Sequence, residues 1–85
     1  MEVTVYGHLR GATGEKTVTV DFDGGTVREA VSALVEAYPR AERHLFDDEA
    51  LESSVRLSVD GATVDPEDDC PADAELSVHP PMQGG

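Results

Sequence analysis

A chain of 85 residues has room for one small domain, and its single cysteine excludes an internal disulfide. Eighteen Asp and Glu against six Lys and Arg give a formal net charge of -12, which disfavours nucleic acid and anionic membranes as partners because both are polyanions. The sequence has neither the pattern of a signal peptide nor an apolar segment of membrane-spanning length, so we expect a cytoplasmic protein.

The chain begins with two segments in which apolar residues alternate with polar ones. In EVTVYGHL, one face is expected to carry Val3, Val5 and Leu9, and the opposite face Glu2, Thr4, Tyr6 and His8. In KTVTVDFD, the shared apolar face is Val18, Val20 and Phe22. The glycines of RGATGE between the two segments predict a loop, so the pair is interpreted as a hairpin.

The segment GGTVREAVSALVEAYP predicts the main helix. Thr26 and Glu29 have the spacing of a capping box, in which each side chain accepts a hydrogen bond from the other residue's backbone N–H. A single apolar stripe then follows at helical spacing: Val27, Ala30, Val31, Leu34, Val35 and Tyr38. Pro39 disfavours helical geometry at Tyr38 and ends the helix.

The second half of the chain predicts three more strands. Residues 40–51 begin with a short helical turn that buries Leu45 and Phe46, and continue as an acidic loop. SVRLSVDGATV predicts a hairpin because Asp-Gly suits a two-residue turn with positive φ. DPEDDCPAD is a loop by composition, and ELSVHP is a last strand with Leu76 and Val78 facing inward. One helical stripe covers one face of a sheet, which predicts a two-layered α+β fold.

This order of elements, followed by HPPMQGG, resembles the β-grasp proteins of the ubiquitin-like class, and in particular the MoaD/ThiS sulfur-carrier family with its small archaeal ubiquitin-like modifiers. The resemblance covers essentially the whole chain and is carried by TVREAVSALVEAYP, the Asp-Gly hairpin and ADAELSVHPPMQGG. It implies a β-grasp domain over residues 1–80 and a flexible tail over residues 81–85. The implied domain is a mixed five-stranded sheet with one main helix on one face, and its first and last strands lie parallel in the centre. The open face would then bring together Tyr6, His8, Ser77 and His79, with Arg56 and Ser58 beyond.

The resemblance also implies where the chemistry takes place. A separate ATP-dependent activating enzyme would join the carboxylate of Gly85 to AMP, and Gly84 and Gly85 would pass its narrow channel because they have no side chains. The chain is then a carrier rather than an enzyme, expected to be a monomer, with no metal and no cofactor of its own. His79 stands where the family usually has an aromatic residue, so we expect the enzyme contact to be weaker or tuned differently here. The expected contact residues are Tyr6, Arg56, His79, Pro80, Pro81, Met82 and Gln83.

Several fates of Gly85 stay open at this point. It can form isopeptide bonds with lysines of target proteins, or carry sulfur as a thiocarboxylate for a tRNA thiolation enzyme. The chain can also be the small subunit of molybdopterin synthase, with its tail in the large subunit, or a β-grasp binding module that is never activated. The Gly-Gly ending argues against the last alternative. Lys16 is the only lysine, and hence the only side chain on which polymers of this protein can form.

The remaining reactive or charged residues favour ordinary structural roles. We expect Cys70 to be an inert loop cysteine, because the acids at 67–69 raise the pKa of its thiol. His8, His44 and His79 lack the spacing of a metal site, and the acidic runs lack the pattern of a calcium loop. The acidic composition resembles cytoplasmic proteins of salt-loving archaea, which predicts a fold that tightens as salt screens its self-repulsion.

Overall fold

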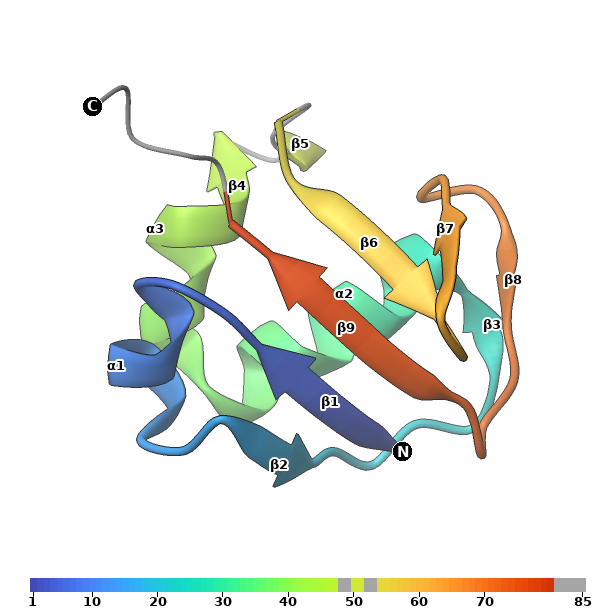
Figure 1. The fold of residues 1–85 in the computed structure, drawn as a ribbon, viewed down its shortest axis with the longest axis horizontal. Helices are drawn as coiled ribbons and strands as arrows, with labels where there is room; N and C mark the ends of the chain where they lie inside the picture. The colour runs from blue at the N-terminus through green and yellow to red at the C-terminus, as the bar shows by residue number, and fades with distance from the viewer. Residues whose placement is uncertain (48–49, 52–53, 81–85) are drawn as a thin grey trace.

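The computed structural model describes residues 1–47, 50–51 and 54–80. Its main sheet has five strands in the order β2-β1-β9-β6-β7 (Figure 1). In this order they are Thr17–Thr19, Glu2–Val5, Glu75–His79, Arg56–Val59 and Ala62–Val64. Strands β1 and β9 are parallel and central, and every other neighbouring pair is antiparallel. This confirms the mixed sheet and the central position of the first and last strands.

Helix α2, Val27–Ala37, packs across one face of this sheet (Figure 1). The predicted capping box is present: the Glu29 N–H donates to Thr26 Oγ1 (3.1 Å), and the Thr26 N–H donates to Glu29 Oε1 (2.9 Å). Four residues of the predicted stripe are buried, namely Val27, Ala30, Val31 and Leu34. They belong to one core with the inward-facing residues of the central strands, Val3, Val5, Leu76 and Val78. The helix ends before Pro39, as predicted, and a 3-10 turn, η1 (Pro39–Ala41), leads into the short helix α3 (Glu42–Leu45).

The segment after β1 differs from the expected loop. Gly7 has φ 60° and turns the chain away from the sheet, and residues Leu9–Thr13 form the short helix α1. The Thr13 hydroxyl donates to the Glu15 carbonyl oxygen (2.6 Å), and Gly14, with φ 81°, closes the helix. Leu9 is buried as expected, but as a helical residue. His8 therefore does not lie on the open face of the sheet, and that prediction is wrong.

Two pairs of very short strands complete the fold. Strand β3 (Gly25–Thr26) pairs with β8 (Asp69–Cys70), and β4 (Phe46–Asp47) pairs with β5 (Ala50–Leu51). The predicted Asp-Gly turn joins β6 to β7, with φ 49° at Asp60 and 86° at Gly61. None of the described helices is long and apolar enough to cross a bilayer.

Cys70 lies in β8 rather than in a loop, and it is buried. Its thiol lies 3.7 Å from the Met1 sulfur. Burial raises the pKa of the Cys70 thiol, and the negative charge of Asp60 raises it further. The direction of this pKa shift agrees with the expectation. Its cause differs, because burial comes first and the acid that contributes is Asp60 rather than the run at 67–69.

Candidate docking surface at the root of the tail

The last described residue, Pro80, is held against the turn that follows β1. Tyr6 continues the pairing of β1 with β9, because its N–H donates to the Val78 carbonyl oxygen (3.2 Å). A Cβ atom on Gly7 would lie only 3.1 Å from Pro80 Cγ, so Gly7 allows the close approach of Pro80 as well as the positive φ. Pro80 is half-buried there. The other tail residues predicted as site, namely Pro81, Met82, Gln83, Gly84 and Gly85, lie outside the described residues.

Two stacked rings lie beside this root on the open face of the sheet. The centroids of the Tyr6 and His79 rings are 4.1 Å apart and their planes differ by 6°. Lys16 Nζ lies 5.3 Å from the centroid of the Tyr6 ring, which is within the range of a cation–π contact. Arg56 stands opposite His79 in the register of β6 and β9. We call Tyr6, Lys16, Arg56 and His79 the stacked-ring patch.

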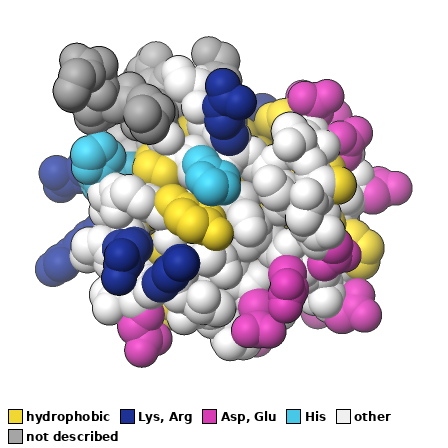
Figure 2. All heavy atoms as spheres, viewed as in Figure 1, with side chains coloured by type: hydrophobic (Ala, Val, Ile, Leu, Met, Phe, Trp, Pro, Cys, Tyr) yellow, Lys and Arg dark blue, Asp and Glu magenta, His cyan; other side chains and the backbone are white. Residues whose placement is uncertain are grey.

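The predicted grouping of Tyr6, His79 and Arg56 is therefore confirmed, together with Ser58 and Ser77, which are register partners in β6 and β9. Figure 2 views the molecule from this side, and its basic side chains gather toward one part of the outline while acidic ones occupy another. A flat aromatic surface flanked by cations, next to the origin of the tail, can contact both apolar and acidic groups of a partner.

A second group of residues surrounds a shallow hollow of about 390 Å³ beside α1. Its lining residues, which we call the basic hollow, are His8, Gly11, Ala12, Arg40, Arg43 and His44. The rings of His8 and His44 lie 5.9 Å apart between centroids, with their planes 20° apart. The pKa of His44 is lowered, first by burial and then by the positive charges of His8 and Arg43.

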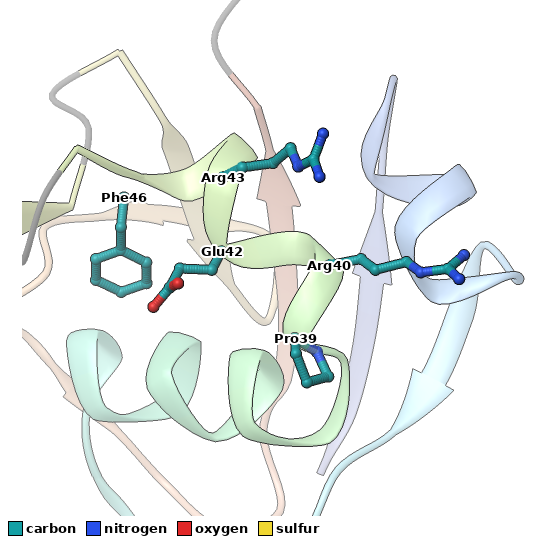
Figure 3. A pocket seen from close by; sticks show the side chains of 5 residues that line it. All are labelled: Pro39, Arg40, Glu42, Arg43 and Phe46. Atoms are coloured by element: carbon teal, nitrogen blue, oxygen red, sulfur yellow. The ribbon is translucent and has the colours of Figure 1, made fainter.

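Figure 3 shows how the charged side chains of η1 and α3 divide. Arg40 and Arg43 both extend toward α1, whereas Glu42 and Phe46 extend to the opposite side. These residues, with Pro39, line a second hollow of about 530 Å³. Sequence reasoning missed the basic hollow, because its residues come from segments on either side of β2, β3 and α2. The one signal in the sequence was the presence of Arg40, Arg43 and His44 within a few residues after Pro39.

The stacked histidines do not amount to a metal centre. Over the described ranges, no three His, Cys, Asp or Glu side chains are close enough together to hold a metal ion.

The comparison with known proteins agrees with this fold over its full length. A sequence profile of the ThiS family matches residues 3–85. Small archaeal modifier protein 1 of Haloferax volcanii is 36% identical over 87 residues, which cover 100% of both chains. A crystal structure of that protein has a TM-score of 0.86 at 34% identity, covering 100% of this chain and 98% of the other. A chain in the BexX/CysO complex of Amycolatopsis orientalis has a TM-score of 0.79 at 25% identity, covering 99% and 98% of the two chains.

Proposed function

Because this chain belongs to the ThiS family, we propose that it is a ubiquitin-like protein modifier whose Gly85 carboxylate is activated by an ATP-dependent enzyme and then joined to lysines of target proteins. Like its relatives, it is a small carrier or modifier protein and not an enzyme. The observation that carries the proposal is the extent of the match. It spans the β-grasp domain and continues through residue 85, so that it includes Gly84 and Gly85.

The chemistry follows from the properties of a terminal carboxylate. Its pKa is near 3.3–3.7, so Gly85 would carry a full negative charge at about neutral pH. One carboxylate oxygen attacks the α-phosphorus of ATP, pyrophosphate leaves, and an acyl-adenylate forms. A lysine amine of the target then attacks the acyl carbon and loses a proton, and AMP leaves with the bonding electrons. The product is an isopeptide bond, and this chain supplies only the acyl group.

The root of the tail supports this delivery. Pro80, the last described residue before the tail, lies close to Gly7 on the domain surface. Five residues can span at most about 17 Å, which sets the depth of the activating site that the carboxylate can reach. The stacked-ring patch adjoins this point and is the surface that we assign to contact with the activating enzyme.

A second role as a sulfur carrier is favoured by the same family membership. In this case a persulfide sulfur attacks the acyl-adenylate, AMP leaves, and a second thiol cleaves the resulting acyl disulfide to release a thiocarboxylate at Gly85. The acceptor would be a tRNA thiolation enzyme or, if this chain is the small subunit of molybdopterin synthase, the large subunit. In both roles ATP belongs to the activating enzyme, and the reactions belong in the cytoplasm.

Intact mass of the protein purified from its native cells separates the two roles. Replacement of one oxygen by sulfur indicates the carrier, and larger species that disappear when Gly84 and Gly85 are deleted indicate the modifier. Trypsin leaves a long remnant on each target because no Lys or Arg follows Arg56, whereas cleavage after Met82 leaves Gln-Gly-Gly. Lys16→Arg should eliminate polymers made through a side chain of this protein.

The activation step is tested by ATP–pyrophosphate exchange with the activating enzyme. We expect Gly85→Ala, or deletion of Gly84 and Gly85, to abolish exchange while the thermal unfolding of the domain is unchanged. Exchange at the wild-type rate by the folded, truncated protein would overturn the proposal.

A further inference from the structure

The basic hollow is an unusual feature for this protein because acids outnumber bases by eighteen to six over the whole chain. With so many carboxylates available, most arginines would be expected to have an acidic neighbour. In the part of the chain that the structure describes, however, no salt bridge joins Arg40 or Arg43 to a carboxylate. Glu42, the acid between them in sequence, extends to the opposite side (Figure 3). The two guanidinium groups therefore concentrate positive charge that the described residues do not neutralise.

The position of the hollow connects it with the tail. His8 directly follows Gly7, which is the residue in contact with Pro80. In Figure 1, α1 and α3 lie on the side of the molecule toward which the end of β9 points. A protein that receives the tail must come close to Pro80, and its surface then lies beside the basic hollow.

We infer that the basic hollow is a docking site for an acidic segment of the protein that receives the tail. Carboxylates of that segment would accept paired hydrogen bonds from the Arg40 and Arg43 guanidinium groups, a geometry for which arginine is well suited. The inference rests on the proposed function, because that function brings a partner to the tail root. A short acidic segment is favoured over RNA, since a long polyanion would also face the negative charge over the rest of the surface.

Binding is tested by two-dimensional NMR of the labelled full chain, titrated with a capped hexaglutamate peptide at about 0.1 M salt, where the Debye length is about 10 Å. We expect the largest shifts at His8, Gly11, Ala12 and His44. Arg40→Gln and Arg43→Gln should each weaken binding by about three- to tenfold, the range for the net contribution of one ordinary hydrogen bond at an exposed site. The matched control is Arg28→Gln, which removes the same charge at the opposite end of α2 and should change affinity by less than about twofold.

Several results would overturn the inference. Equal losses in all three variants would mean that the peptide senses only net charge, and shifts outside the hollow would place the site elsewhere. Inorganic phosphate that competes at the same residues with equal affinity would make the hollow a site for small oxyanions. Tighter binding of an oligouridylate at these residues would make it a nucleic acid site. Dispersed spectra of the variants, all of which change exposed residues, confirm that they are folded.

The proposed function is separated from this inference by ATP–pyrophosphate exchange with the same proteins. We expect Arg43→Gln to raise the KM for this chain several-fold with kcat unchanged, because a docking contact that takes no part in the reaction contributes to binding alone. If the wild type supports exchange, Arg43→Gln does not change it and the peptide does not bind, the docking site is rejected and the modifier function stays intact. Peptide binding at the hollow without exchange would reject activation and leave the docking site intact.

Discussion

Replacing Gly7 with alanine tests how the root of the tail is held. The substitution places a Cβ on a residue with φ 60°, a left-handed conformation that costs an L-residue about 1–2 kcal/mol. The new atom would also lie 3.1 Å from Pro80 Cγ, closer than ordinary van der Waals contact, so Pro80 must move by a few tenths of an ångström. We therefore expect Gly7→Ala to lower the free energy of unfolding and to shift the start of the tail.

Gly14→Ala is the matched control, because Gly14 has φ 81° but open space where its Cβ would stand. Both variants have the cost of the left-handed backbone, and only Gly7→Ala has the contact with Pro80. Each kcal/mol lost lowers the melting temperature of a domain of this size by about 4–8 °C, so the backbone term alone is measurable. Urea unfolding gives the free energies, and ATP–pyrophosphate exchange reports whether the tail is still presented.

Pro80→Ala completes the test by removing Cγ. In the double variant with Gly7→Ala, Pro80→Ala should restore the part of the unfolding free energy that Gly7→Ala loses through the contact. The coupling energy between the two substitutions should be about 0.5 kcal/mol or more, as is usual for residues in contact. Combined with Gly14→Ala, Pro80→Ala should be additive. Equal stabilities of the Gly7 and Gly14 variants, together with no coupling to Pro80 and unchanged exchange, would refute the argument that Gly7 holds the tail root.

Three further predictions concern the domain itself. Thr26→Ala removes the acceptor for the Glu29 N–H and should cost about 1 kcal/mol in urea unfolding, while Ser at this position should retain most of the stability. Burial, with His8 and Arg43, lowers the pKa of His44 below 6.5, so the unfolded chain binds the proton more readily. Stability should accordingly fall as pH decreases from about 7 through the ordinary histidine range, and His44→Asn should reduce this slope; identical pH profiles of the two proteins would contradict it. The chain has a net charge of -12, and salt screens the repulsion between its acidic side chains: the Debye length falls from about 10 Å at about 0.1 M to about 3 Å at about 1 M. The melting temperature should therefore rise over this range of potassium chloride concentration. A constant melting temperature would show that self-repulsion does not limit the stability of the fold.

The features that could be predicted from the sequence are those that local physics determines. The capping box and the apolar stripe of α2 lie within one short segment, and Pro39 ends that segment in any context. The Asp60-Gly61 turn likewise depends on two adjacent residues that tolerate positive φ. The parallel pairing of β1 with β9 is not local. It came from the resemblance of the whole chain to the β-grasp class.

The failures arose where one residue redirects the chain or where distant segments meet. The alternation of residues 2–9 predicted one continuous strand, but Gly7 turns the chain and moves His8 to a different surface. The spacing of Leu9 and Thr13, followed by a glycine, is the pattern that could have indicated the short helix α1. The cluster of Arg40, Arg43 and His44 after Pro39 indicated only one side of the basic hollow, since His8 meets His44 only through the packing of α1 near η1 and α3.

The central pairing of β1 with β9 also fixes the order of events during synthesis. Strand β1 is made at the start of translation, yet one of its two partners, β9, is the last described strand to leave the ribosome. Until Glu75–His79 has emerged, β1 and β6 each lack a neighbour, and the sheet is split into two separate hairpins. Nascent chains that stall earlier therefore cannot form this domain. A folded domain therefore contains the chain at least through His79, and a shorter stalled chain lacks the sheet face that β1, β9 and β6 form together.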